Sequence, residues 1–269
     1  MSSCGAAAGL AIDGADLWVR RRGAGSPVVC LHSVGHDGRD FEGLADRCSD
    51  AFEFICPDWP GHGRSGPDYA PVSAARYAQL VDGLLDKLGI ANPILVGNSI
   101  GGSAAILCAS RRPVRGLVLC DSGGLVAVNA AVRAFCSVFE RLFIAGARGA
   151  SWYPAVFALY YRLVLTEPPA RARRGDIIAG ARRLAPLLRQ AWASFARPDA
   201  DLRAAAAALD APIWVAWARS DRLIPLAMVR PALDQLQNAR LSLFRGGHSP
   251  FLEQPDAFAA EFQEIAGRW

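Results

Sequence analysis

Hydrophobic residues along the chain follow two patterns that alternate. Six short, continuous apolar runs are typical of buried strands; they are Pro27–Leu31, Phe52–Cys56, Pro93–Val96, Val114–Cys120, Pro212–Trp217 and Leu241–Phe244. Between them lie segments with helical spacing, such as Ala74–Leu88, after which Gly89 provides a C-terminal stop. Strands that alternate with helices predict an α/β fold, with a mostly parallel sheet covered by helices on both faces.

One long segment interrupts this alternation. Residues 124–200 are helical in pattern and rich in aromatic residues, namely Phe135, Phe139, Phe143, Trp152, Tyr153, Phe157, Tyr160, Tyr161, Trp192 and Phe195. We interpret residues 124–200 as a helical lid inserted after the strand Val114–Cys120, and residues 1–123 and 201–269 as the core. Amphipathic helices that merely pack on the core would have the same apolar content, so the function of each aromatic residue stays open.

Composition narrows the class of protein. Hydrophobic residues make up 52% of the chain and charged residues 20%, which is typical of a globular protein with a large core. No uncharged apolar run reaches 18 residues, so we expect no membrane span. The first residues lack a basic segment followed by an apolar stretch, and they predict no secretory signal. The seven cysteines are scattered without a C-x-x-C pair, which favours a reducing, cytoplasmic location.

The charge distribution is uneven. The net charge of +4 is too small to indicate a nucleic-acid-binding protein. Residues 124–200 nevertheless contain 11 arginines and only four acidic residues, so the predicted lid is basic. These arginines either lie on solvated helix faces or gather at the pocket mouth, where they would attract anionic substrates. Nothing in the sequence indicates an interface between copies of the chain.

Polar residues directly after strands are the candidates for chemistry, because ligands of parallel sheets bind beyond the carboxyl ends of the strands. Ser99 lies in the segment GNSIGG (Gly97–Gly102), at a predicted strand-to-helix turn that is typical of a nucleophile elbow. A serine needs a base, and His248 is the histidine that follows the last strand. A carboxylate would orient that imidazole, and Asp221 is favoured over Asp121, whose alternative role is to bond backbone amides.

The chain resembles the α/β-hydrolase family over nearly its whole length, and within it the carboxylesterase and lactonase branch. Besides GNSIGG it contains the family's D-x-x-G-x-G-x-S turn at Asp58–Ser65, the acid loop D-x-x-x-P at Asp221–Pro225, and G-H-x-P-F-x-E-x-P at Gly247–Pro255. The resemblance implies the α/β-hydrolase fold with an inserted helical lid. It also implies a catalytic triad of Ser99, Asp221 and His248 that requires no metal and no organic cofactor.

The resemblance places an oxyanion hole after the first predicted core strand. Family members usually carry His-Gly-x there, whereas this chain carries HSVG (His32–Gly35), so Ser33 replaces the glycine. By position, the two donors are the backbone N–H groups of Val34 and Ile100. Such preorganised donors stabilise the negative charge on the oxygen of a tetrahedral intermediate.

Other residues near these motifs are candidates for substrate contacts. We expect Ser33, His36 and Trp152 to contact the substrate, although His36 and Asp37 could equally be solvated at the surface. By analogy with the family, His62 in the glycine-rich turn is structural.

Together, these motifs predict acyl transfer from a small-molecule ester or lactone. The acyl group would be held on Ser99 as an acyl-enzyme and then released by water. The serine argues against the dehalogenase and epoxide-hydrolase branches, which use aspartate at the elbow. A thioesterase is an alternative. A carbon–carbon bond hydrolase of aromatic ring-cleavage products is a second alternative, because those enzymes commonly carry asparagine before the serine, as Asn98 is here. Against this alternative, Ser249 stands where those enzymes usually have tryptophan. A ligand-binding protein without turnover is disfavoured because all three triad residues are present.

Overall fold

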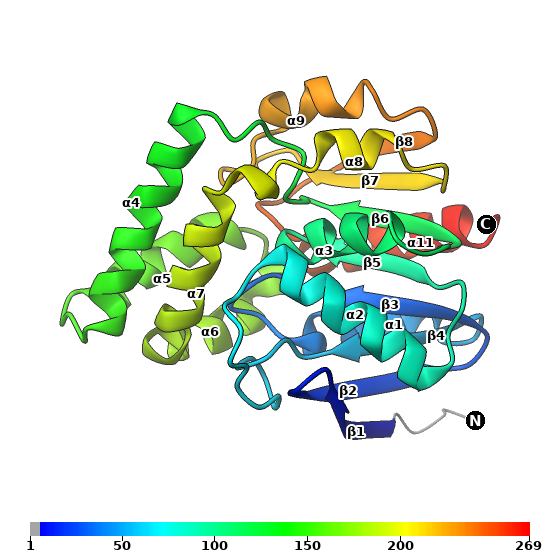
Figure 1. Cartoon of the computed structure of the whole chain (residues 1–269), viewed down its shortest axis with the longest axis horizontal. Coiled ribbons are helices and arrows are strands. Elements are labelled where there is room, and N and C mark those ends of the chain that lie inside the picture. Colours follow the sequence, from blue (N-terminus) through cyan, green and yellow to red (C-terminus); the bar gives the residue numbers. More distant parts are fainter. Residues whose placement is uncertain (1–5) are drawn as a thin grey trace.

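The computed structural model of the protein describes residues 6–269 and contains one eight-stranded sheet (Figure 1). The strand order is β1-β2-β4-β3-β5-β6-β7-β8; the pairs β1–β2 and β2–β4 are antiparallel and all other pairs are parallel. The strands are β1 (Ala6–Ile12), β2 (Ala15–Gly23), β3 (Ser26–Leu31), β4 (Phe52–Pro57), β5 (Ile94–Asn98), β6 (Gly116–Cys120), β7 (Ile213–Ala218) and β8 (Ala239–Phe244). The predicted mostly parallel α/β sheet is confirmed.

Helices cover both faces of this sheet, which explains the continuous apolar runs. In β6, Leu117 and Leu119 point into one core and Val118 and Cys120 into the other, so every residue of the strand is buried. One face is covered by α1 (Glu42–Cys48), α10 (Pro250–Glu253) and α11 (Pro255–Ala266), and the other by α2 (Ala74–Leu88), α3 (Ile100–Ala109), α8 (Arg203–Ala207) and α9 (Leu226–Leu233). Three short 3₁₀ helices span Gly38–Phe41, Pro168–Ala170 and Pro198–Ala200.

The helix predicted from Ala74 to Leu88 is observed with the same bounds. The side chain of Ser73 accepts a hydrogen bond from the N–H of Arg76 and caps the first turn. Gly89 ends the helix in the left-handed conformation, at φ 66°. Both signals are local, which is why the sequence could locate the ends of this helix.

The apolar runs of the sequence do not predict the first two strands, β1 and β2. In β2, Ala15, Leu17 and Val19 are buried while Asp16 is exposed, so the strand alternates and does not form an apolar run. Most of β1 is exposed at the sheet edge, where its sequence lacks a strand signal. Both strands belong to the antiparallel part of the sheet, where one side can face water.

Four of the five α-helices between β6 and β7 gather beyond one end of the sheet (Figure 1). They are α4 (Ala130–Ala147), α5 (Tyr153–Val164), α6 (Arg171–Ala179) and α7 (Ala181–Phe195), and we call them the helical insertion. Phe139 of α4 stacks on Trp192 of α7 with ring centroids 4.2 Å apart, and Phe143 and Phe157 are fully buried. These aromatic residues thus pack the insertion itself. Its division from the core at residues 124 and 200, and its action as a lid, stay predictions.

No helix among residues 6–269 combines the length and the apolar character needed to cross a membrane. The longest, α4, has 18 residues and carries Arg133, Glu140 and Arg141.

A buried ionic cluster joins the insertion to the core. Arg173 of α6 lies 3.0 Å from Asp37 and 2.5 Å from Asp40, which also accepts a hydrogen bond from Nδ1 of His36 at 2.6 Å. Burial alone would raise the pKa of both aspartates, but their partners, Arg39 and Arg173 for Asp37, and His36 and Arg173 for Asp40, hold the pKa of each below its usual value. Arg173 is therefore a largely buried anchor of the insertion and not a solvated helix residue.

Replacing Arg173 with methionine is expected to destabilise the protein by about 3–5 kcal/mol, because buried Asp40 loses its arginine and buried Asp37 keeps only Arg39. Since the folded-state pKa values of the aspartates are depressed, the wild-type advantage is present at neutral pH. This difference in stability between wild type and variant should disappear as the pH falls below about 4, towards the lower pKa values of the two aspartates in the folded protein. Thermal melts of Arg173→Met across this pH range measure it. Arg171→Met, in an exposed residue of the same helix, is the matched control; equal stability of both variants at pH 7 would contradict the prediction.

Candidate functional site

Ser99 occupies a one-residue turn between β5, which ends at Asn98, and α3, which begins at Ile100. Its backbone has φ 55° and ψ −118°, a conformation that non-glycine residues rarely adopt. A Cβ atom at Gly97 would lie 2.5 Å from the carbonyl oxygen of Gly101, and one at Gly101 would collide with the carbonyl oxygen of Leu31. Both glycines are therefore required by close backbone packing, as in a nucleophile elbow.

Asp221 and His248 form a buried pair. They follow β7 and β8, which are neighbouring parallel strands, so their loops meet at the same edge of the sheet. Nδ1 of His248 lies 2.8 Å from Oδ2 of Asp221. Oδ1 of Asp221 accepts hydrogen bonds from the N–H groups of Leu223, at 2.8 Å, and Ile224, at 3.1 Å. The carboxylate is thus held in place, and Nε2 of His248 is left for a second partner.

Asn98 connects the serine turn to the histidine loop. Its side-chain N–H₂ group donates to the backbone carbonyl of His248 at 2.9 Å and to that of Cys120 at 3.0 Å. Its oxygen accepts a hydrogen bond from the hydroxyl of Ser249 at 3.1 Å. The residue before Ser99 therefore contacts the backbone of the candidate base directly. In the sequence, Asn98 is only a marker of a family branch, and no local pattern predicts its hydrogen bond to the histidine loop.

Glu253 of α10 connects the histidine loop to the insertion. Its fully buried carboxylate accepts hydrogen bonds at Oε2 from the N–H groups of Gly247 and His248, at 2.7 and 3.0 Å. At Oε1 it accepts from the N–H of Thr166 at 2.6 Å and from that of Glu167 at 3.1 Å. In the sequence, Glu253 is only the glutamate of the G-H-x-P-F-x-E-x-P motif. Its burial next to so many backbone donors makes it a positioning residue.

Replacing Glu253 with glutamine is expected to destabilise the protein by roughly 2–4 kcal/mol and to slow turnover. Both oxygens of Glu253 accept N–H donors, so the amide nitrogen of glutamine must face donors in either orientation. Thermal melts and initial rates of ester hydrolysis measure the two effects. Glu264→Gln, on the surface of α11, is the matched control; a Glu253→Gln protein as stable as this control would contradict the prediction.

Two buried histidines shape the loop after β3. Nε2 of His32 accepts the N–H of Trp59 at 2.9 Å, and its Nδ1–H donates to the carbonyl of Ser33 at 2.7 Å. Nε2 of His62 accepts the N–H of Gly35 at 2.9 Å. Burial lowers the pKa of His32 to about 4 and that of His62 to about 3, so both are neutral at physiological pH. The geometry of His62 agrees with its expected structural role.

This loop carries Val34 beside the serine turn, because β3 and β5 are neighbours and Leu31 is paired with Gly97. Among residues 6–269, neither the N–H of Val34 nor that of Ile100 donates to a protein acceptor. Two backbone donors near a serine could stabilise an oxyanion. Their assignment to an oxyanion hole stays a prediction.

The three predicted substrate-binding residues lie in different surroundings. Ser33 is buried, and His36 is buried in its pair with Asp40, so neither His36 nor the buried Asp37 is a solvated surface residue. Trp152 precedes α5 with half of its side chain exposed. No hydrogen bond or ring contact joins these side chains to Ser99 or His248 in the part of the chain that the structure describes, and their role in substrate binding stays a prediction.

Tyr161 of α5 is, in the sequence, only one of the aromatic residues of the segment 124–200, and no local pattern predicts its position. A Cβ atom at Gly35 would lie 2.9 Å from the hydroxyl of Tyr161, which places this hydroxyl beside the loop of Val34. The ring centroids of Tyr161 and His36 lie 5.8 Å apart. The insertion therefore contributes a buried polar group next to the candidate oxyanion loop.

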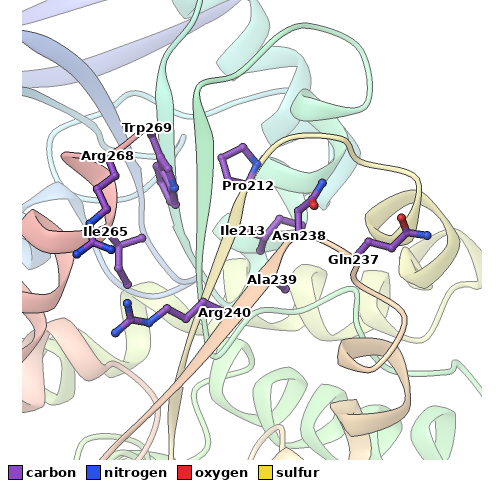
Figure 2. Close-up of a pocket in the computed structure, with 9 residues that line it drawn as sticks. All are labelled: Pro212, Ile213, Gln237, Asn238, Ala239, Arg240, Ile265, Arg268 and Trp269. Atoms are coloured by element: carbon purple, nitrogen blue, oxygen red, sulfur yellow. The ribbon is translucent and has the colours of Figure 1, made fainter.

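A surface pocket lies far from these residues, at the amino ends of β7 and β8 (Figure 2). Arg240 and Arg268 line it, but Arg240 pairs with Glu261 and Glu264, and Arg268 also pairs with Glu264. Ligands of parallel sheets bind at the opposite, carboxyl ends of the strands, where Ser99, Asp221 and His248 lie.

Comparisons with known proteins agree with this fold. The alpha/beta hydrolase family matches residues 28–261. A pimeloyl-(acyl-carrier protein) methyl ester esterase of Stenotrophomonas maltophilia is 29% identical over 272 aligned residues, which cover 91% of this chain and 95% of the relative.

Solved structures share the fold. An esterase from Thermogutta terrifontis superposes with a TM-score of 0.81 at 19% identity, over 98% of both chains. An enol-lactonase from Burkholderia xenovorans superposes with a TM-score of 0.80 at 22% identity, over 97% of this chain and all of that one. With a family match over most of the chain and the expected sheet topology, the protein belongs to the alpha/beta hydrolase family.

Proposed function

We propose that the protein is a serine hydrolase that cleaves carboxylic esters or lactones through an acyl-enzyme on Ser99. The observation that carries this proposal is the meeting of a strained serine turn with the buried His248–Asp221 pair at one edge of the sheet. Asn98 bonds to the backbone of His248 and keeps the serine turn and the base together. Few other reactions require this combination of groups.

In the proposed reaction, His248 removes the proton of Ser99 as the hydroxyl oxygen attacks the substrate carbonyl. Asp221 keeps Nδ1 of His248 protonated and stabilises the imidazolium that forms. The N–H groups of Val34 and Ile100 donate to the tetrahedral oxyanion. His248 then returns the proton to the leaving alcohol, and water repeats the sequence to release the acid.

The proposed substrate class rests on the geometry and on the relatives together. The similar protein of Stenotrophomonas maltophilia is named a methyl ester esterase, and one structural neighbour is an enol-lactonase. A carbon–carbon bond hydrolase receives no separate support, because the hydrogen bonds of Asn98 account for that residue structurally. A thioesterase would use the same groups on a different acyl donor. A reducing, cytoplasmic location also belongs to this proposal.

A hydrolysis panel tests the proposal. It should contain short- and medium-chain esters, lactones, thioesters and a vinylogous 1,5-diketone, each assayed with the purified chain. We expect the highest kcat/KM for an ester or a lactone, and mass spectrometry should locate a phosphonate adduct on the peptide that contains Ser99. Preferential thioester or diketone cleavage would reassign the substrate class. An intact protein that neither turns over any substrate nor takes the label would overturn the function.

A further inference from the structure

A second buried carboxyl group lies against the Asp221–His248 pair. Asp121 follows β6 and is completely buried, with its backbone at φ 41°. One carboxylate oxygen of Asp121, one of Asp221 and one ring nitrogen of His248 all lie within 4.8 Å of one another. Oδ1 of Asp121 accepts the N–H of Ala218 at 2.8 Å, whereas its buried Oδ2 has no donor among the described residues.

Two carboxylates this close and this deeply buried cannot both be charged without a large cost. The surroundings of Asp121 add no compensating cation: Glu253 adds negative charge and Tyr160 faces Asp221 as a neutral phenol, while no arginine or lysine of residues 6–269 pairs with either aspartate. Burial, and after it the charge of Asp221, raises the pKa of Asp121 well above its usual value. One proton must therefore reside on this pair of carboxyl groups.

Hydrogen bonding decides which group carries that proton. Asp221 accepts from Leu223, Ile224 and the Nδ1–H of His248, and each of these bonds favours its ionised form. Asp121 accepts from Ala218 alone, and its second oxygen is free to carry a hydrogen. Asp221, which accepts more hydrogen bonds, is therefore the better site for the negative charge.

We propose that Asp121 carries a proton at Oδ2 and donates a hydrogen bond to Asp221, which makes Asp121 a positioning residue for the base His248. The inference rests on the proposed function. Asp121 then provides a further donor to the carboxylate that holds the imidazole, without adding negative charge beside it. Its hydrogen bond from Ala218 at the same time ties the ends of β6 and β7 together.

Two substitutions separate the proposed role from a merely structural one. The side chain of asparagine has the shape of a protonated aspartic acid: its oxygen can accept from Ala218 and its N–H₂ can donate to Asp221. Asparagine also tolerates a positive φ. Asp121→Asn should therefore recover most of the activity that Asp121→Ala loses. For Asp121→Ala we expect at least a tenfold lower kcat with a nearly unchanged KM, while thermal melts verify that both variants fold.

The pH dependence of kcat/KM gives the decisive readout. If Asp121 is neutral in the wild type, Asp121→Asn removes no charge, and the acid limb set by His248 should stay within about 0.3 pH units. If Asp121 were ionised, its removal at such a short distance would move that limb down by roughly one pH unit or more. Such a downward shift would overturn the proposal, and so would equal activity of the alanine and asparagine variants.

An infrared measurement tests the proton without relying on catalysis. The difference spectrum between wild type and Asp121→Asn at pH 7 should contain the C=O stretch of a protonated carboxylic acid. A spectrum with carboxylate bands only would overturn the proposal, as would turnover that chelation by EDTA abolishes, because a cation would then hold the two carboxylates together. A wild-type protein that shows the acid band but hydrolyses no ester would contradict the proposed function alone.

Discussion

Replacing Ser99 with alanine is expected to lower kcat/KM for ester hydrolysis by about 10⁴-fold or more and to abolish labelling by an organophosphonate. The hydroxyl of Ser99 is the proposed nucleophile, so its removal leaves only the general binding and polarising effects of the site. Initial rates with the best ester of the hydrolysis panel and mass spectrometry of the labelled protein measure both effects. The fold should be retained, because alanine removes one oxygen from a turn whose close packing depends on Gly97 and Gly101.

The matched control is Ser110→Ala, at the other end of the same helix α3. There the hydroxyl donates to the carbonyl of Ile106 and lies far along the helix from the serine turn. Ser110→Ala should keep wild-type turnover and wild-type labelling. Undiminished hydrolysis by pure Ser99→Ala protein would remove the nucleophile assignment, and with it the proposed function.

Replacing Asp221 with asparagine is expected to slow turnover by about 10³- to 10⁴-fold. Oδ2 of Asp221 accepts the Nδ1–H of His248 at 2.8 Å, and an amide nitrogen in that position would favour the wrong tautomer. Oδ1 can still accept from Leu223 and Ile224, so we expect the loop to keep its shape. The measurement is kcat for the same ester, together with a thermal melt of the variant.

Asp234→Asn is the matched control for this substitution. Asp234 pairs with Arg230 on the surface, beyond the end of α9, and should tolerate the change without loss of activity. The proposal also predicts a strong contrast between the two neighbouring aspartates, since Asp121→Asn preserves a donor whereas Asp221→Asn destroys an acceptor. A larger loss of activity for Asp121→Asn than for Asp221→Asn would assign the role of the triad acid to Asp121, at the end of β6.

Much of the fold could be predicted because its signals are local. The central parallel strands are buried on both faces, so each reads as a short apolar run, as in the segment from Gly116 to Cys120. Helix α2 has its cap Ser73 and its stop Gly89 inside one short stretch of sequence. Strands β1 and β2 have no such run, because β1 is mostly exposed at the sheet edge and β2 alternates buried with more exposed residues, so neither could be predicted from the sequence.

The candidate catalytic residues could also be located from sequence, since parallel strands bring their carboxyl ends to one edge. That topological rule alone predicts that the residues after β5, β7 and β8 lie near one another. The close approach of Gly101 to Leu31 then explains why the flanking positions are glycine. By contrast, the sequence could not decide whether His36 and Asp37 contact the substrate or are solvated at the surface. The structure places both in the ionic cluster around Arg173.

The sequence by itself determined the α/β architecture, the insertion of helices after β6 and the order of serine, aspartate and histidine along the chain. Only the tertiary structure decided how the buried polar groups are paired. Asn98 and His248 are 150 positions apart, and Glu253 accepts hydrogen bonds from residues 87 and 86 positions away. A buried polar group must find a partner wherever the fold supplies one, and no local pattern encodes a partner so distant in sequence. For the same reason the contact of Asp121 with Asp221 could not be seen before β6 and β7 were placed side by side.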